Sequence, residues 1–358
     1  MVGTNNLTHI LSDSSHWSRQ AFSASQTLAV ESEKPFSSLY IQWDLVPGTY
    51  AIVWDGGSLE CGLYGFLHEY IRLPEAVTRV EFVFTTGERH SLCDIQVLTE
   101  GVAPEGVQDW QPPCEEADIL VFPTHSDDDV LFFGPLISYY TIERGLTVQT
   151  AFMVEHTYYP ERNHERLNGL WTMGVRNYPI LGTAPDTDTH NINEAMSYYA
   201  ASNIEAWQVE QIRRFRPLVV VGHDFNGEYG NGGHKVNAYY LARAIESSSD
   251  PEQFPESAEI YGTWDTPKLY VHLHPENEIL LDVYSPMEHD PQGRSPFQVA
   301  VDAFKCHVSQ HKWGYRVETE RRSYDCRPFG LYRTLVGDDT TADIMENIDI
   351  SYWRSYGS

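Results

Sequence analysis

Four polar residues that can bind a metal ion or move a proton follow one short apolar run. The run is Ile119–Phe122, a pattern typical of a strand that is buried on both faces. Directly after it come His125, Asp127, Asp128 and Asp129. Adjacent carboxylates repel one another unless a cation or solvent separates them. This segment alone therefore leaves two interpretations open, a solvated helix cap or a metal site.

A second loop, about a hundred residues later, repeats the arrangement. Another short apolar run at 218–221 is followed by a glycine-rich loop, which leads to His234 at the expected start of a helix. With His125 and Asp128 from the first loop, His234 completes a set of two imidazoles and one carboxylate. That is the donor set of a catalytic zinc site, which keeps a fourth position for water. Asp127 beside it could take a proton from such a water.

Strands alternate with helical patterns throughout the part of the chain that holds both loops. This alternation predicts an α/β fold with a doubly wound, mostly parallel, Rossmann-like sheet. Open sheets of this kind place their sites at the carboxyl ends of strands, so we expect the two loops to lie side by side. The expected elements are strands at 146–154, 268–273 and 278–283, and helices from Val130, at 162–174, at 204–215, from about His234 and at 296–310.

The first hundred residues have a different pattern, in which short β-branched and aromatic runs are separated by turn signals. This pattern predicts an all-β sandwich, with strands at 38–45, 49–55, 79–85 and 93–98. A segment rich in proline, glycine and acids at 100–116 indicates a linker. We therefore expect two domains, 1–108 and 109–358. The aromatic residues of the first could fill its core or stack on sugar rings: Trp17, Tyr40, Trp43, Tyr50, Trp54, Tyr64, Phe66 and Tyr70.

The overall charge and the cysteines limit the partners. The 358 residues include 51 acids and 24 bases, a formal net charge of −27, which argues against nucleic acid or an anionic membrane surface as partner. No apolar run reaches the roughly 18 residues of a transmembrane helix. The first ten residues lack the features of a signal peptide, so the chain as written is expected in the cytoplasm, although a mature secreted chain would look the same. Five cysteines without a CxxC pair make a thiolate zinc site unlikely.

Three segments of the sequence resemble the motifs of the PIG-L (LmbE-like) zinc-dependent deacetylases. The first family motif is Ala-His-Pro-Asp-Asp-Glu, and residues 124–129 read Thr-His-Ser-Asp-Asp-Asp. A second element, Arg-x-x-Glu at a helix start, matches residues 162–165. The third motif usually reads Gly-Tyr-Gly-His-Pro-Asp-His, and residues 228–234 read Glu-Tyr-Gly-Asn-Gly-Gly-His. The match covers about 118–250.

The resemblance implies an LmbE-like fold and an N-acetyl-sugar deacetylase activity. It implies that His125, Asp128 and His234 are zinc ligands and that Asp127 is the general base. Tyr229 matches a tyrosine that the family uses near the scissile carbonyl. The implied partner is a carbohydrate or glycoconjugate substrate, most simply one of the N-acetylglucosamine type.

Two further positions qualify the resemblance. Arg162 matches family arginines that contact substrate, although pairing with Glu165 at a solvated helix start is an equal alternative. Asn231 stands where the family has a histidine assigned to the tetrahedral intermediate or to the leaving amine. Asparagine can donate a hydrogen bond to an oxyanion but cannot deliver a proton near neutral pH. Either Asp186 or Asp188 could meet sugar hydroxyls, as a family acid often does.

Asn231 leaves three functions open. The first is zinc-dependent N-acetyl-sugar hydrolysis, with weakened turnover or with Asp127 as both base and acid. The second is a zinc amidase acting on a non-sugar N-acyl conjugate, because the same chemistry cleaves other amides. The third is a catalytically impaired, metal-containing glycan-binding protein.

Overall fold

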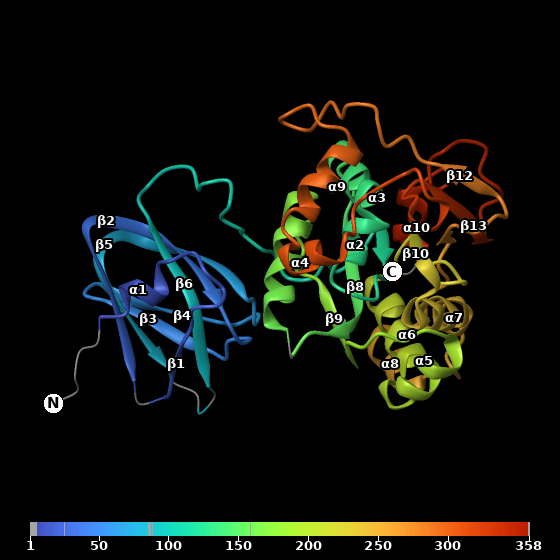
Figure 1. Cartoon of the computed structure of the whole chain (residues 1–358). Helices are drawn as coiled ribbons and strands as arrows, with labels where there is room; N and C mark the ends of the chain where they lie inside the picture. The colour runs from blue at the N-terminus through green and yellow to red at the C-terminus, as the bar shows by residue number, and fades with distance from the viewer. Residues whose placement is uncertain (1–5, 25, 85–86, 88, 158, 357–358) are drawn as a thin grey trace. The chain divides into compact units, whose positions relative to one another are not determined.

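The computed structural model describes residues 6–24, 26–84, 87, 89–157 and 159–356. The chain divides into two compact units, Met1–Pro112 and Pro113–Ser358 (Figure 1). The sequence placed the boundary four residues earlier, at 108. The first five residues, on which part of the signal-peptide argument rests, and Thr85, the last residue of a predicted strand, lie outside the described residues.

The amino-terminal unit is built from six antiparallel strands and one helical turn. The strands form one hydrogen-bonded sheet in the order β1-β6-β2-β5-β3-β4. The two short strands β1 and β4 were not predicted. The elements are α1 (Thr8–Leu11), β1 (Gln20–Phe22), β2 (Thr27–Trp43), β3 (Tyr50–Trp54), β4 (Gly57–Cys61), β5 (His68–Phe84) and β6 (His90–Leu98).

This sheet is bent at its two long strands. The pairing of β2 with β5 shifts register between Glu31 and Phe36, a bulge that bends a strand. On one side of the bulge β5 continues to β3, and on the other side β2 continues to β6. Trp43 at the end of β2 packs on Tyr50 of β3, with ring centroids 5.0 Å apart. The two halves of one continuous sheet therefore enclose an aromatic core, and the predicted sandwich of two separate sheets is not confirmed.

The second unit contains a seven-stranded mixed sheet in the order β12-β13-β11-β10-β7-β8-β9. The five strands from β9 to β11 are parallel, and β13 and β12 are antiparallel at one edge. The mixed α/β fold predicted from the sequence is confirmed. The strands are β7 (Ile119–Val121), β8 (Val148–Glu155), β9 (Ile180–Pro185), β10 (Val219–Gly222), β11 (Lys268–His272), β12 (Glu278–Leu280) and β13 (Pro328–Thr334).

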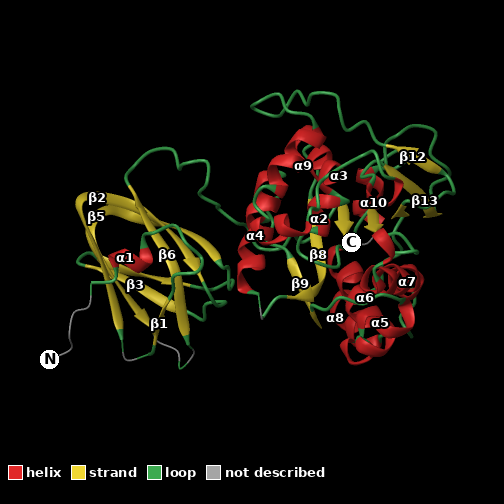
Figure 2. Ribbon diagram, viewed as in Figure 1, coloured by secondary structure: helices red, strands yellow, loops and turns green. Residues whose placement is uncertain are grey.

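Two groups of helices accompany this sheet (Figure 2). In one group α9 packs on α2, α3 and α4, and in the other α6 packs on α7 and α8, while α5 packs on α7. The chain runs outward from β7 to β9 and then returns to β10 and β11, so right-handed crossovers put the two groups on opposite faces. The helices are α2 (Asp128–Leu131), α3 (Gly134–Ser138), α4 (Pro160–Thr172), α5 (Ile192–Tyr198), α6 (Ile204–Phe215), α7 (Gly232–Ser247), α8 (Pro255–Tyr261), α9 (Pro296–Phe304) and α10 (Ile350–Tyr356).

Most predicted elements of this unit agree with the structure, but several differ. The helix expected from Val130 is broken into α2, α3 and a π-helical turn at Tyr139–Glu143. The helix expected at 296–310 ends at Phe304. Strand β9 begins before a stretch that looked irregular, and β13 adds an antiparallel edge that the sequence did not predict. None of the helices described is both long and apolar enough to cross a membrane.

The order of the parallel strands decides where a site can form. β7 and β10 are neighbours, but the chain leaves them toward opposite faces of the sheet. Their following loops therefore separate, and a crevice opens at the carboxyl ends of these two strands. The loop after β7 carries His125 and the loop after β10 carries His234.

Candidate metal centre

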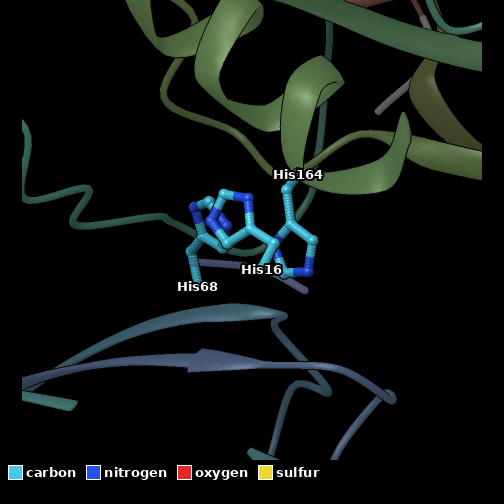
Figure 3. A group of neighbouring side chains, drawn as sticks. All are labelled: His16, His68 and His164. Carbon is cyan, nitrogen blue, oxygen red and sulfur yellow. The ribbon is translucent and has the colours of Figure 1, made fainter. Parts of the chain in front are cut away.

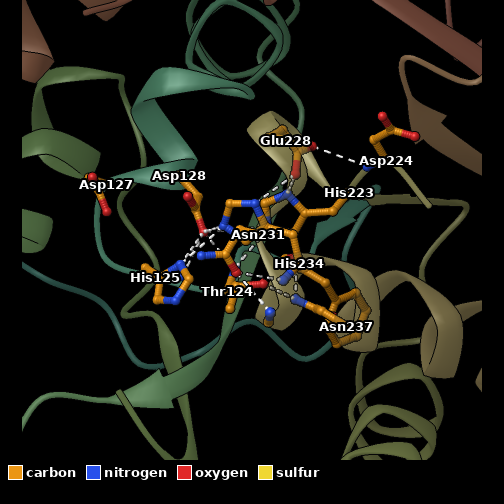
Figure 4. A network of polar contacts seen from close by, with 12 residues as sticks. Thr124, His125, Asp127, Asp128, His223, Asp224, Glu228, Asn231, His234 and Asn237 are labelled. Carbon is orange, nitrogen blue, oxygen red and sulfur yellow. Dashed lines mark hydrogen bonds and ion pairs between the residues drawn. The ribbon is translucent and has the colours of Figure 1, made fainter. Parts of the chain in front are cut away.

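The crevice between β7 and β10 brings three donor atoms together (Figure 4). His125 Nδ1 lies 3.1 Å from His234 Nε2 and 3.2 Å from Asp128 Oδ2. The third distance, from His234 Nε2 to Asp128 Oδ2, is 3.1 Å. Two ligands on a tetrahedral zinc ion with bonds of about 2.0–2.1 Å lie about 3.3 Å apart. The triangle therefore fits a single small divalent ion, and the three residues are a group able to hold a metal.

The loop after β7 is folded around the Asp128 carboxylate. Asp128 Oδ2 accepts hydrogen bonds from the backbone N–H groups of His125, at 2.6 Å, and Thr124, at 3.2 Å. Burial alone would raise the pKa of Asp128, but His234 and His125 beside it hold that pKa well below its usual range. Asp128 is therefore charged and fixed, as a metal ligand must be.

Behind His234 lies a buried carboxylate that the sequence analysis did not select. Glu228 Oε2 lies 3.0 Å from His234 Nδ1 and 2.7 Å from His223 Nδ1. Glu228 Oε1 accepts hydrogen bonds from the backbone N–H of Asp224, at 3.1 Å, and from His272 Nδ1, at 2.9 Å. Glu228, His223, His234 and His272 are all inaccessible to solvent. We call these four residues the Glu228 cluster.

The centre contains two buried carboxylates, Asp128 and Glu228, whose negative charges need positive charge nearby. Burial alone would raise the pKa of Glu228, but the positive charge of His223 and the contacts with His223, His234 and His272 together hold that pKa well below its usual range. Burial lowers the pKa of His223, but Glu228 and Asp128 raise it to about 9. The pKa of His234 is raised in the same way by Asp128. Protons on imidazole thus compensate two buried carboxylates, and a divalent ion can replace such protons.

Asp127 lies beside the triangle and is held by an arginine. Arg162 Nη2 donates to Asp127 Oδ1 at 2.8 Å, and Arg162 Nη1 donates to Asp186 Oδ2 at 2.7 Å. Burial raises the pKa of Asp127, and the charge of Arg162 partly opposes this. A carboxylate with a raised pKa next to a metal centre is suited to accept a proton. Arg162 does not pair with Glu165, whose carboxylate instead binds Ser309.

Asp186 belongs to the site, whereas Asp188 lies farther along the same segment. Asp186 Oδ2 lies 3.0 Å from His156 Nδ1, and Asp186 Oδ1 lies 3.8 Å from His125 Nε2. The sequence could not choose between the two acids, since both stand in one polar stretch. Asp188 instead faces Asn231, with Oδ1 3.5 Å from the Asn231 amide nitrogen.

Asn231 caps helix α7. Its Oδ1 accepts hydrogen bonds from the backbone N–H of Gly233, at 2.8 Å, and of His234, at 3.2 Å. These two N–H groups have no partner within the helix, so the cap fixes the first turn, which carries His234. Gly232, the first residue of α7, lets the helix start lie close to the backbone of Asn191, because a Cβ at this position would be 2.6 Å from the Asn191 backbone oxygen.

Tyr229 is held in an unusual backbone conformation at the rim of the site. Its φ is +45°, in the left-handed region that residues other than glycine rarely adopt, and strain of this kind gathers at functional sites. Its ring lies edge-on to His234, with centroids 5.4 Å apart, and the side chain is 39% exposed. Tyr324 and Tyr315 stack near-parallel to it, at centroid distances of 5.4 and 5.9 Å.

These two tyrosines come from a segment far along the chain, and no pattern in the sequence predicts that they lie beside Tyr229. The pKa of Tyr315 is raised by burial and by the charge of Asp127. Together Tyr229, Tyr315 and Tyr324 form what we call the tyrosine wall.

Asp129, next to the ligand Asp128, has no solvent exposure and no hydrogen-bond partner for its carboxylate oxygens among the described residues. Burial and the charge of Asp127 raise its pKa well above the usual range. Asp129 does not belong to the groups of described residues with the spacing of metal ligands.

The amino-terminal unit also holds two neighbouring histidines, His16 and His68, with ring centroids 6.0 Å apart (Figure 3). Both already face an amide, His16 Nε2 at 3.2 Å from Gln42 Oε1 and His68 Nδ1 at 2.7 Å from Gln108 Oε1. Burial lowers the pKa of His68 to about 3, so it stays neutral. Within this unit the pair is a packed polar contact.

Comparison with known proteins finds relatives that are named as deacetylases. No family model matches the chain. The chain is 27% identical over 210 residues to 1D-myo-inositol 2-acetamido-2-deoxy-alpha-D-glucopyranoside deacetylase 1 of Catenulispora acidiphila, covering 50% of this chain and 62% of that protein. It is 32% identical over 100 residues to 1D-myo-inositol 2-acetamido-2-deoxy-alpha-D-glucopyranoside deacetylase 2 of Saccharopolyspora erythraea. This match covers 28% of this chain and 35% of that protein. These homologues are deacetylases, and the chain spans less than two thirds of their length.

Solved structures with a similar fold are more distant. N,N'-diacetylchitobiose deacetylase from Pyrococcus horikoshii aligns with a TM-score of 0.45 at 15% identity, covering 62% of this chain and 86% of that chain. The 4-carboxy-2-hydroxymuconate hydratase GalB of Pseudomonas putida aligns with a TM-score of 0.41 at 15% identity, covering 63% of this chain and 99% of that chain. Likeness at this level carries no argument about function, so the function rests on the site and the homologues.

Proposed function

We propose that this chain is a metal-dependent hydrolase that removes the N-acetyl group from an amino sugar or a glycan of the N-acetylglucosamine type. The observation that carries the proposal is the triangle of His125 Nδ1, Asp128 Oδ2 and His234 Nε2, with edges of 3.1–3.2 Å. The homologues, named for the deacetylation of a 2-acetamido-2-deoxyglucopyranoside, support the same substrate class.

The donor set suits zinc. Two imidazole nitrogens and one carboxylate leave a fourth position open, as in catalytic rather than structural zinc sites. A zinc ion bound there would polarise the acetyl carbonyl and bring the pKa of a water close to neutrality.

Asp127 is the proposed proton carrier. As the oxygen of water attacks the acetyl carbon, the Asp127 carboxylate takes the water proton. The same carboxyl group then gives the proton to the amide nitrogen while the C–N bond breaks, which yields acetate and the free amino sugar. Arg162 keeps Asp127 oriented through its 2.8 Å hydrogen bond to Oδ1.

The remaining residues of the site hold the substrate and the developing charge. The Tyr229 hydroxyl group is proposed to donate to the oxyanion of the tetrahedral intermediate. Asn231 contributes less than a histidine would, because its amide oxygen is engaged in capping α7 and its amide nitrogen faces Asp188. Asp186 and Arg162 offer a charged acceptor and donor for sugar hydroxyls, and the tyrosine wall offers rings on which the apolar face of a sugar can stack.

Acetate release tests the proposal. Purified full-length protein loaded with zinc is incubated with N-acetylglucosamine, with N,N'-diacetylchitobiose and with a panel of N-acyl amino acids and other non-sugar amides. We expect acetate from the N-acetyl sugars. Turnover of the non-sugar amides alone would replace the proposal by the alternative zinc amidase.

A second candidate is a metal-containing glycan-binding protein without turnover, and the capping role of Asn231 favours it. Without the family's histidine, a separate acid for the leaving amine is missing from this position. Restoring it with Asn231→His separates the candidates. A binder gains acetate release only in the variant, whereas an active enzyme already releases acetate as the natural chain.

We further propose that the amino-terminal unit binds carbohydrate. Most of its aromatic residues are in the core, but Tyr64 and Trp17 are 66% and 74% exposed, and Tyr64 is stacked on Phe66 at 5.4 Å. A rigid exposed ring is suited to stack on a sugar. In the full chain, Tyr64→Ala should weaken retention on an N-acetylglucosamine polymer while leaving metal content unchanged; equal retention would remove this role.

A further inference from the structure

Glu228 stands at the centre of a buried arrangement that the proposed catalytic steps do not use. It is a full negative charge without solvent exposure, and three imidazole rings lie around it. Burying a carboxylate is costly unless its oxygens have partners. Its two oxygens face different partners, and this difference determines what the residue can do.

Oε2 faces two histidines through nitrogens that must carry a proton. Glu228 Oε2 lies 3.0 Å from His234 Nδ1, an ion-pair distance without hydrogen-bond geometry, at which a carboxylate attracts a protonated nitrogen and repels a lone pair. His234 therefore has its proton on Nδ1, and a neutral ring then leaves the lone pair on Nε2. Nε2 is the atom that lies 3.1 Å from both His125 Nδ1 and Asp128 Oδ2.

Oε1 holds the carboxylate in place. The backbone N–H of Asp224 donates to it at 3.1 Å, and that donor cannot change its role. His272, from strand β11, adds a contact at 2.9 Å, while its Nε2 lies 2.8 Å from the backbone oxygen of Asp325. Glu228 is thus fixed from a second loop and from a neighbouring strand.

We propose that Glu228 is a positioning residue of the metal centre, which fixes the proton of His234 on Nδ1 and so presents Nε2 to the ion. Metal-ligating histidines commonly give their other N–H to such a carboxylate. The inference rests on the metal of the proposed function but not on the substrate or the reaction. It assigns a role to a residue that stands in the third motif where the family usually has glycine.

The substitution Glu228→Gln gives a specific test. The N–H of Asp224 requires an acceptor, so the glutamine oxygen takes the position of Oε1 and the NH2 group takes that of Oε2. The NH2 group then faces His234 Nδ1 as a donor, which moves the proton of His234 to Nε2. We expect the affinity for zinc, measured by competition with a fluorescent chelator without substrate, to fall about 10- to 100-fold.

Glu69→Gln is the matched control. Glu69 is an acid of the amino-terminal unit that also accepts three hydrogen bonds, from Trp43, Tyr50 and Gly62. The substitution again replaces a carboxylate by an amide, but at a position far in the sequence from the proposed metal ligands. We therefore expect the zinc affinity of this variant to be unchanged. A folded Glu228→Gln protein that binds zinc as tightly as the natural chain would overturn the inference.

A measurement on the natural chain keeps the inference testable if the variant does not fold. ¹⁵N NMR of histidine-labelled, zinc-loaded protein distinguishes protonated from metal-bound ring nitrogens. We expect a protonated Nδ1 and a metal-bound Nε2 for His234. A metal-bound Nδ1 would instead place the ion between His223, Glu228 and His234, which also have ligand spacing, and would overturn the inference. Absence of deacetylation with the expected NMR result would refute only the proposed function.

Discussion

Partly buried Glu69 of the amino-terminal unit and fully buried Glu228 of the α/β unit each lie among several hydrogen-bond donors, and the two glutamates have opposite pKa shifts. In the amino-terminal unit, burial raises the pKa of Glu69, and its bonds from Tyr50, Gly62 and Trp43 only partly oppose this. In the α/β unit, the pKa of Glu228 lies well below its usual range. The difference lies in the partners, because hydroxyl, amide and indole groups stay neutral whereas imidazoles can become charged.

This comparison supports our proposal that the chemistry takes place in the α/β unit. The partners of Glu69 give a carboxylate hydrogen bonds but no charge, so it contributes only to packing and structure. The partners of Glu228 are imidazole rings, which can hold protons. One of these rings, His234, also lies 3.1 Å from His125 Nδ1 and from Asp128 Oδ2. A buried acid is therefore informative about function when its partners can titrate or bind a metal.

The largest effect is expected for Asp127→Asn. The amide cannot accept the water proton, so kcat/KM for an N-acetyl sugar should fall about 10²- to 10⁴-fold. Zinc content and the unfolding of the amino-terminal unit, followed by calorimetry, should not change. Unaltered turnover in this variant would show that Asp127 is not the base.

Removal of the metal should affect one unit only. A chelator should lower the unfolding temperature of the α/β unit. An ion whose free concentration is 100 times its dissociation constant stabilises the folded state by about 2.7 kcal/mol, and the chelator removes this stabilisation. The amino-terminal unit, with histidines that already contact amides, should unfold at the same temperature with and without chelator. Equal shifts in both transitions would mean that the ion is not confined to the α/β unit.

A smaller effect is expected at the start of α7. Asn231→Ala removes the acceptor of two backbone N–H groups and should cost about 1 kcal/mol of unfolding free energy. Asn231→Asp keeps an acceptor and should retain most of that stability. Denaturant unfolding of the three proteins measures the difference, and equal stability of the alanine variant would contradict a capping role.

The smallest effect concerns the pH dependence of Glu69. Because its pKa in the folded state is raised above 4.5, its ionisation destabilises the fold as the pH rises through that raised value. Compared with Glu69→Gln, the natural chain should therefore lose stability between pH about 4.5 and neutrality. Parallel unfolding temperatures across this range would show that the Glu69 carboxylate is not destabilised by burial.

The sequence predicted the strands and the three donor residues because these depend on local patterns. Apolar runs before His125 and His234 indicated buried strands, and parallel strands necessarily bring their carboxyl ends to one edge of the sheet. The breaks after Leu131 and Ser138, and the antiparallel strand β13, depend on packing between distant segments, which periodicity does not contain.

The sequence did not predict the parts of the site that depend on three-dimensional contacts. Glu228 was quoted within the third motif without a role, because the sequence does not show that it is buried among three imidazole rings. Tyr315 and Tyr324 reach the site from the carboxy-terminal part of the chain. Asp186 could be separated from Asp188 only by its contact with Arg162.

The most direct test of the account is a crystal structure of the zinc-loaded protein, with anomalous data collected at the zinc absorption edge. The account predicts one peak per chain, about 2.0–2.2 Å from His125 Nδ1, Asp128 Oδ2 and His234 Nε2. A loaded protein without a peak between these three atoms, or with its ion held elsewhere, would contradict it.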